Sequence, residues 1–404
     1  MGKAFLSSEM KMNRIYRASL ILALLLGAVG NLAAQDKQNM FNPVNFGVTS
    51  LAIAPDARGG AMGDIGAATE ADANSQYWNP SKYPFNIARA GVSASYTPWL
   101  RQLVNDINLA NVAGFYRIGD YSSLSGSLRY FSLGEVFLSE ADDAMSISPY
   151  EFALDLGYSR MLSERFSMGV GMRFIFSDIT YDYTAESKPG KAFAADISMY
   201  RLGYFLAGNR ECSFGWGLNV SNIGSKISYG GDDNAEFIPT NLRLGMNVTI
   251  PFNEYNKFSV AADVNKLLVP TYPKQMEGEA DNDYTDRVQR EYYDISPISG
   301  IFKSFHDAPG GFKEEMQEVQ WSVGMEYTYN DRFMLRAGYH HEAENKGNRK
   351  YFTAGAGFHM SIFSIDAAYV FSTSQTNPLD QTMRFTLGFD LDGIKDMFST
   401  RRRR

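Results

Sequence analysis

The sequence predicts an all-β protein, a transmembrane antiparallel β-barrel of about fourteen strands with an N-terminal plug segment. From residue 91 onward, segments of about ten residues alternate between apolar and small or polar side chains, which is the two-residue period of a strand. Short and long connections alternate between these segments. No stretch after the first 34 residues approaches the ~20 apolar residues of a membrane-spanning helix.

The first 34 residues are predicted to be a secretory signal peptide. Lys11, Arg14 and Arg17 precede an apolar run over residues 18–29, and Leu32-Ala33-Ala34 follows it. Basic residues, a short apolar run and small residues at a cleavage site make up such a peptide. Because the apolar run is too short to span a bilayer, we expect the chain to be exported, and its barrel to lie in the cell outer membrane.

Residues 35–90 are predicted to form a plug, or hatch, in the mouth of the barrel. This segment is rich in Gly, Ala and Asp and lacks a strong period. It contains the runs Gly59-Gly60-Ala61-Met62-Gly63-Asp64 and Trp78-Asn79-Pro80-Ser81. The candidate motif residues of the plug are Gly60, Met62, Gly63, Asp64, Asn79 and Pro80.

Residues 91–392 are predicted to form the barrel itself. Phe152, Leu154 and Leu156, for example, alternate with Ala153, Asp155 and Gly157. A barrel in lipid turns such apolar side chains outward and fills its lumen with polar ones. A soluble β-sandwich would bury the apolar faces instead, and periodicity alone does not separate the two.

Connection lengths favour the membrane barrel. Short links fall near residues 119–120, 161–164, 207–211, 251–256, 330–331 and 362, and longer connections lie between them. Outer-membrane barrels have short periplasmic turns and long external loops. An even number of strands then places both termini in the periplasm, where residues 393–404 form a basic tail.

The connection over residues 267–316 is predicted to be a long external loop. Loops of such length are usually functional or disordered. Exposed apolar clusters rimmed by charge mark interaction surfaces, and this loop is acidic at first and aromatic later. The candidate residues for binding cargo or another partner are Tyr292, Tyr293, Phe302, Phe305 and Phe312. In an alternative interpretation, these aromatic residues fold back and close the mouth.

Two parts of the sequence resemble known barrel families. The plug motif, with Trp78-Asn79-Pro80-Ser81, resembles the hatch of the long-chain fatty-acid transporter superfamily. The run over residues 296–361, with Asp307-Ala308-Pro309-Gly310-Gly311 and Leu335-Arg336-Ala337-Gly338-Tyr339, resembles the PorV family of the type IX secretion system of Bacteroidetes. This second resemblance spans nearly all of the mature chain.

The resemblance to the PorV family implies an outer-membrane shuttle for protein secretion. Such a protein binds the C-terminal signal domains of secreted cargo proteins at the translocon barrel and passes them to a surface attachment complex with a sortase-like protease. The resemblance also implies contact of the barrel with outer-membrane lipid. The barrel itself is not expected to be the conducting pore.

We expect no enzymatic, metal or cofactor site. His340-His341 with Glu342 and Glu344 could suggest a metal site or half of a hydrolase dyad. Alternation turns His340 inward and His341 toward the lipid boundary, and no Ser stands in a recognisable nucleophile motif. The net charge of -7 argues against a nucleic-acid surface. The single cysteine, Cys212, has no disulfide partner.

Two further functions stay open. One is a fatty-acid-like transporter of hydrophobic small molecules, which needs an apolar pocket beneath the hatch and a lateral opening in the wall. The other is a lipid A modifying barrel enzyme, which the PorV resemblance also suggests.

Overall fold

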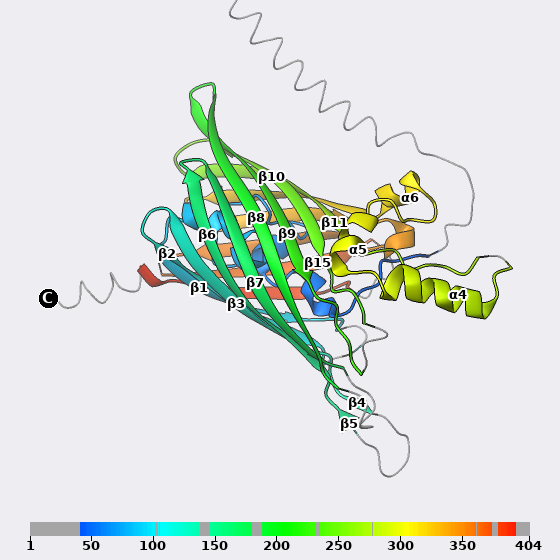
Figure 1. Cartoon of the computed structure of the whole chain (residues 1–404). Coiled ribbons are helices and arrows are strands. Elements are labelled where there is room, and N and C mark those ends of the chain that lie inside the picture. Colours follow the sequence, from blue (N-terminus) through cyan, green and yellow to red (C-terminus); the bar gives the residue numbers. More distant parts are fainter. Residues whose placement is uncertain are drawn as a thin grey trace, which may run out of the picture. The chain divides into compact units, whose positions relative to one another are not determined.

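A computed structural model describes residues 41–101, 104, 106–137, 146–179, 188–230, 235–276, 278–360, 362–373 and 379–392. Within these residues, fourteen antiparallel strands form a closed barrel in which the first strand pairs with the last (Figure 1). The predicted fold class is therefore confirmed. Closure pairs every barrel strand with two neighbours, so the sheet has no edge strand within the wall. The predicted signal peptide (1–34) and basic tail (393–404) lie outside the described residues.

The barrel strands follow the sequence in order around the wall. They are β1 (Ala90–Pro98), β2 (Asn108–Ile118), β3 (Ser122–Ser132), β6 (Tyr150–Ser163), β7 (Phe166–Asp178), β8 (Gly190–Ala207), β9 (Arg210–Gly224), β10 (Asn241–Pro251), β11 (Asn256–Leu267), β12 (Val319–Tyr329), β13 (Phe333–His341), β14 (Lys350–His359), β15 (Phe363–Ser372) and β16 (Met383–Asp390). The short strands β4 (Val136–Phe137) and β5 (Ser146–Ile147) form a separate pair within the β3–β6 connection.

The wall is apolar outside and charged inside. Leu156 and Met172 are exposed on the outer surface, whereas Asp155 and Arg173, one residue along each strand, are buried. A soluble protein would show the opposite distribution. The predicted alternation is confirmed, and the outer surface is that of a barrel made to face lipid.

The two ends of the barrel differ in their connections. Turns of a few residues join β2 to β3, β6 to β7, β8 to β9, β10 to β11, β12 to β13 and β14 to β15, and all lie at one end, here called the short-turn end. β1 begins and β16 finishes at this end, where Gly91 is opposite Asp390. Longer connections lie at the opposite, long-loop end.

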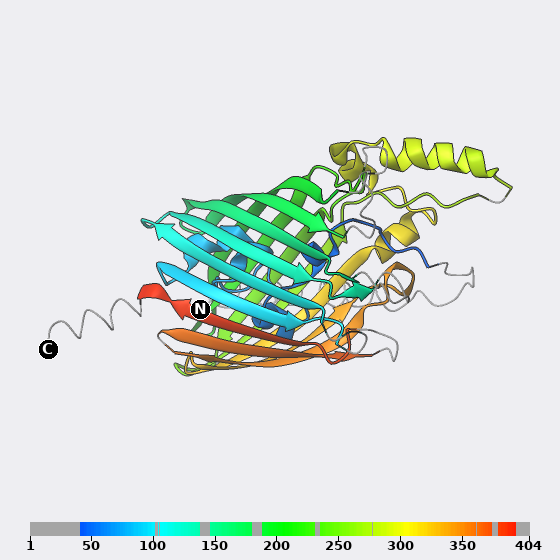
Figure 2. The same ribbon diagram turned by 90° about the horizontal axis from the view of Figure 1, so that it is seen from below.

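The segment 41–89, here called the plug, runs through the lumen and contains η1 (Thr49–Ala52), α2 (Ala57–Ala61), α3 (Ser75–Trp78) and η2 (Pro80–Phe85). It starts at the long-loop end, where the Asn42 amide donates to the Asn345 carbonyl (2.7 Å). It ends at the short-turn end, where the Arg117 amide donates to the Arg89 carbonyl (2.7 Å). Figure 2 shows its blue helices inside the ring of strands.

The course of the plug bears on the expectation that both chain ends lie in the periplasm. The first described residue, Phe41, lies at the long-loop end, opposite to the start of β1, and both chain ends lie outside the described residues. The even strand count determines only that the first strand begins, and the last strand finishes, at the same end of the barrel. The plug traverses the lumen before the first strand begins, which reverses the side on which it starts.

The connection between β11 and β12, residues 268–318, is here called the crown. It folds into α4 (Asp281–Val288), the π-helical turn η4 (Gln289–Tyr293), α5 (Pro297–Lys303) and α6 (Phe312–Gln317) (Figure 1). A further turn, η5 (Glu344–Lys346), lies in the β13–β14 connection. Among the described residues, no helix has the length and apolar character needed to cross a membrane.

Candidate functional site

The plug touches the inner wall so closely that glycine is required at the contacts. A Cβ added to Gly338 of β13 would overlap with the backbone of Met62 and Gly63, and one added to Gly217 of β9 would overlap with the carbonyl of Ala67. Backbone atoms cannot rotate away as a side chain can. The wall strands are therefore shaped to hold the plug in one position.

The predicted motif residues of the plug explain why its chain turns where it does. Gly63 and Asp64 have φ values of 81° and 62°, in the left-handed region that glycine adopts easily and Asp tolerates. This turn directs the Asp64 carboxylate to Arg384 of β16, and the Tyr351 hydroxyl donates to it over 2.6 Å. Gly60 lies beneath the same arginine, where a Cβ would overlap with the guanidinium.

Asn79 joins the second half of the plug to the wall. Its side-chain amide donates to the Ala67 carbonyl in the plug and to the Met199 carbonyl in β8, both over 2.9 Å. Its side-chain oxygen accepts from the Ser81 amide, which caps the turn that Pro80 begins. The motif residues thus act as positioning residues for the plug.

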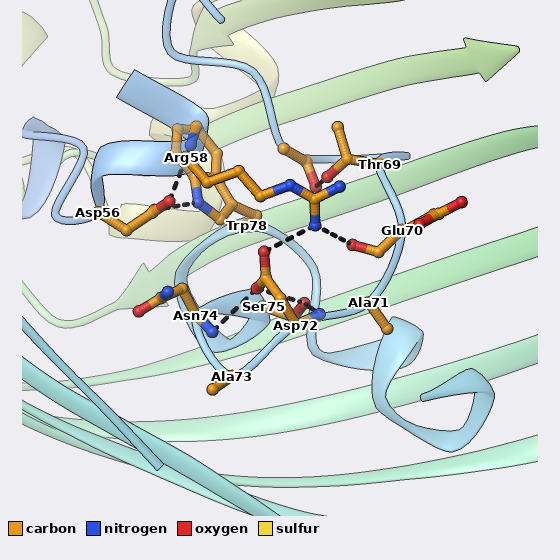
Figure 3. Close-up of polar contacts among 12 residues, drawn as sticks. Asp56, Arg58, Thr69, Glu70, Ala71, Asp72, Ala73, Asn74, Ser75 and Trp78 are labelled. Atoms are coloured by element: carbon orange, nitrogen blue, oxygen red, sulfur yellow. Dashed lines mark hydrogen bonds and ion pairs between the residues drawn. The ribbon is translucent and has the colours of Figure 1, made fainter. Parts of the chain in front are cut away.

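Arg58 connects the plug to the ion pairs of the lumen. Within the plug it donates to Asp72 (3.0 Å) and to the Glu70 carbonyl (3.1 Å), as Figure 3 shows. It also contacts Glu326 of β12 (3.2 Å), which Arg336 of β13 meets from the other side. Buried charges are tolerated when every partner is present, so this chain of ion pairs fixes the plug to the wall.

Two titratable groups inside the plug have shifted pKa values. Burial, together with the nearby carboxylate of Asp72, raises the pKa of Asp56 to about 6. Asp56 nevertheless accepts from the Trp78 indole (2.6 Å), as Figure 3 shows, and from the Gly59 amide (2.8 Å). Burial lowers the pKa of Lys82 to about 8, although its ammonium donates to the Gly66 carbonyl (2.7 Å). Both groups are enclosed and have hydrogen-bond partners, as structural groups do.

Beside the plug, a cavity of about 380 Å³ lies at the long-loop end. One side is apolar, with Trp99 from the β1–β2 connection, Phe131 from β3 and Phe46 from the plug. The other side carries Lys346 and Arg349, which are paired with glutamates. The size and mixed lining suit an amphiphilic small molecule.

The crown rests on an aromatic cluster that contains two of the five predicted partner-binding residues. The Tyr292 ring packs edge-on against Phe237 and Tyr272, with centroids 5.3 Å and 5.0 Å apart. The ammonium of Lys226 donates to the carbonyls of Tyr292 and Tyr293 (3.0 and 2.8 Å). Tyr292 is only 2% exposed. These two tyrosines therefore support the crown from within, which resembles the alternative of aromatics folding back over the mouth.

The other three predicted residues face solvent. Phe302, Phe305 and Phe312 are 68%, 48% and 81% exposed. Phe302 lies one turn after the exposed Ile298 on α5, and Phe312 lies one turn before the exposed Met316 on α6, so each helix presents an apolar pair on one face. Exposed apolar groups of this kind are typical of interaction sites.

Ion pairs hold the crown to the rim of the barrel. Lys346 contacts Glu314 (2.7 Å) and Glu318 (3.0 Å), and Lys266 contacts Glu318 (2.6 Å). Nearby, the carboxylate of Asp307 accepts from the Thr271 amide (2.9 Å). Burial raises the pKa of Asp307 to about 6. Sequence reasoning missed these basic residues because they come from strand ends and another connection.

Sequence reasoning also missed a serine beside His340. Ser322 lies opposite His340 in the β12–β13 ladder, and its hydroxyl is 2.9 Å from Nδ1. Only the strand register brings the two together. Ser322 is 1% exposed and is absent from the lining of the cavity beside the plug, whereas His340 lines a second, smaller cavity in the lumen. His341 instead stacks on Trp321 (4.9 Å). Within the described residues, no group of three or more His, Cys, Asp or Glu could hold a metal ion.

Comparisons with known proteins match the chain to one protein family and to several solved barrel structures. The model of a family described as type IX secretion system protein PorV matches residues 34–274. No curated protein matches the chain in sequence.

Solved structures with a similar fold include two toluene transporters and a FadL homologue, all of low sequence identity. The Pseudomonas putida toluene transporter TodX is 10% identical, covers 83% of this chain and 97% of its own, and has a TM-score of 0.48. The Ralstonia pickettii toluene transporter TbuX (12%, 83% and 96%, 0.41) and a Pseudomonas aeruginosa FadL homologue (12%, 83% and 98%, 0.41) are similar in the same way.

Proposed function

Because the chain belongs to the PorV family of type IX secretion system proteins, we propose that it binds the C-terminal signal domains of secreted cargo at the translocon and shuttles them to the surface attachment complex. The observation that carries this proposal is the crown, whose helices α5 and α6 expose Phe302, Phe305 and Phe312. An apolar surface held on a folded support binds a partner at a low entropy cost.

The filled lumen supports the same proposal. The plug is fixed to the wall by backbone contacts at Gly338 and Gly217 and by ion pairs at Arg58 and Asp64. A segment fixed in this way occupies the lumen from one end to the other, which favours binding of cargo at the outside of the barrel, with the pore supplied by the translocon.

The test is a triple substitution of Phe302, Phe305 and Phe312 to Ser, expressed in cells that lack the native gene. We expect cargo with a C-terminal signal domain to accumulate unprocessed inside the cell while the barrel remains at its usual level in the outer membrane. The matched control changes Asp281, Asp283 and Asp286 on α4 to Asn, which alters the crown but leaves its aromatic surface unchanged. Normal surface display of cargo by the triple Phe variant would refute the proposal.

Binding of a hydrophobic small molecule is the second candidate, favoured by the 380 Å³ cavity. Lateral release into the membrane would need an interrupted wall. In the described residues, every strand pairs with both neighbours, and register shifts occur only near Met161–Ser163 and Ala195–Ile197. Fluorescent fatty acid should therefore bind to the purified barrel without being transferred into vesicles, and transfer would favour the transporter.

A lipid A modifying activity has less support, because Ser322, the serine that contacts His340, is buried. Unchanged lipid A in cells that carry Ser322→Ala and His340→Gln would remove it.

A further inference from the structure

The hairpin of β8 and β9 extends beyond its neighbours at the short-turn end. The β7–β8 ladder ends at Phe166 opposite Arg201, and the β9–β10 ladder ends at Ser213 opposite Thr249. The β8–β9 ladder continues to Ala207 opposite Arg210. Residues 203–212, here called the overhang, thus stand as a two-stranded ribbon, and Figure 1 shows this green hairpin rising past the adjacent strand ends.

The β7 side of the overhang is a free strand edge. The Leu202 amide donates to the Arg165 carbonyl, on the β7 side. Backbone groups alternate in direction along a strand, so those of Tyr204 and Leu206 point to the same side, where no described strand pairs with them. Such an edge is a ready template for a further strand.

The overhang is also apolar on both faces. Phe205 continues the outward face of Phe193 and Ile197, whereas Tyr204 and Leu206 continue the inward face of Ser198. The three overhang side chains are 52% (Tyr204), 44% (Phe205) and 74% (Leu206) exposed. Membrane lipid can cover the outward face only. The inward face, which stands beyond the barrel wall, needs a different cover.

A groove of about 430 Å³ lies beside the free edge, where β7 begins. It is lined by the β6–β7 turn, residues 163–166, and by Arg201 of β8. Neither Arg165 nor Arg201 forms an ion pair with any other described residue. A chain laid along the edge of β8 would pass both guanidinium groups.

We propose that an extended acidic segment of a periplasmic protein adds to the edge of β8 at Tyr204 and Leu206 and meets Arg165 and Arg201. Lipid phosphates could pair with the arginines but could not satisfy the strand edge. A second copy of this chain would bring its own arginines to the same groove, and like charges oppose that pairing. The site lies at the end of the barrel away from the crown, so it does not depend on cargo binding there.

Photo-crosslinking in intact cells tests the site. The photoreactive residue p-benzoylphenylalanine replaces Tyr204 in one variant and Phe205 in a second. In a matched control it replaces Tyr121, which is 60% exposed in the β2–β3 turn at the same end. We expect the probe at Tyr204 to give one discrete protein adduct that maps to a segment rich in Asp and Glu. The probe at Phe205 should label lipid, and the control should give neither a discrete protein adduct nor the acidic segment.

Two variants then test how the segment is held. Reversal of charge in Arg165→Glu with Arg201→Glu should lower the adduct yield at Tyr204 at least tenfold. Leu206→Pro, which removes an edge amide that β9 does not use, should lower it to a similar extent. The proposal would be overturned if the probe at Tyr204 gave no adduct, phospholipid adducts alone, or adducts with a second copy of this chain. Equal protein adducts at Tyr204 and Tyr121, or an adduct yield that neither variant changes, would also overturn it.

Discussion

The plug and the crown are the two large parts of the described chain that lie outside the barrel strands, and they differ in how far their large side chains are buried. The plug buries Trp78, Tyr83 and even Lys82, and each polar group among these finds a partner. The crown leaves Phe302 and Phe312 in solvent. Irregular backbone survives inside a barrel only when its polar groups are satisfied. The crown is therefore better suited than the plug to bind a partner protein.

The two segments also differ in how they are attached. The plug is held by backbone contact with wall glycines and by buried ion pairs that run across several strands. The crown is attached at its base, by an aromatic cluster and by Lys346 and Lys266. The comparison therefore predicts large effects for changes in the plug contacts and smaller, local effects in the crown.

The largest effect is expected for Gly338→Val. Its side chain would occupy the space of the Met62 and Gly63 backbone, so either the plug or β13 must move. We expect a loss of more than about 5 kcal/mol, because backbone atoms that are overpacked cannot rotate away. The shift from compact to extended migration on heating, together with protease cleavage of the plug, measures it. In the control, Gly203→Ala in β8, the nearest atom lies 3.8 Å away, and wild-type behaviour is expected.

Asp64→Ala should have the next largest effect. It leaves Arg384, which is buried in β16, without its carboxylate partner. Removal of one member of a buried pair costs about 3–5 kcal/mol. The denaturant midpoint for release of the plug measures this loss. The matched control is Asp331→Asn, which breaks an exposed pair with Lys257 and should cost less than about 1 kcal/mol. Equal losses in both variants would contradict the difference between buried and exposed attachment.

The sequence predicted the wall well because each strand carries its own period. The alternation of Leu154 and Leu156 with Asp155 is local, and it survives in the structure as an exposed and a buried face. The plug glycines were identifiable for the same reason, as a dense run at residues 59–66. The direction of the plug was not, since no local pattern tells at which end of a barrel a segment enters.

The candidate sites were harder to predict because they depend on contacts between distant residues. Tyr292 and Phe312 are alike in sequence, and only the position of Phe237 and Lys226 makes one a support and leaves the other exposed. In the same way, the register of β12 and β13 places Ser322 beside His340. Such contacts are set by tertiary packing, which the single sequence does not display.

That division within the crown gives the third prediction. Tyr292→Ala removes a buried ring and should destabilise the crown by about 3 kcal/mol. Phe312→Ala removes an exposed ring and should change stability by less than about 0.5 kcal/mol. Hydrogen exchange of the crown amides measures both. Binding of a cargo C-terminal signal domain should weaken in both variants, but only Tyr292→Ala should also lose amide protection; the reverse pattern would reject the assigned roles.

The smallest effect concerns the pH dependence of the crown. Burial raises the pKa of Asp307 from its usual value near 3.8 to about 6. A carboxyl whose pKa is raised by folding stabilises the folded state when protonated, and this contribution is lost as the pH rises through about 6. The crown should therefore be more strongly protected at pH 5 than at pH 7.5.

Asp307→Asn should remove this pH dependence of crown stability. Because Asp307 is only partly buried, solvent screening limits the difference to about 1 kcal/mol. The amide of Thr271, which donates to Asp307, should exchange more slowly at pH 5 than at pH 7.5 in the native chain after correction for intrinsic rates. In Asp307→Asn the two corrected rates should agree. A pH dependence that persists in Asp307→Asn would show that Asp307 is not its source.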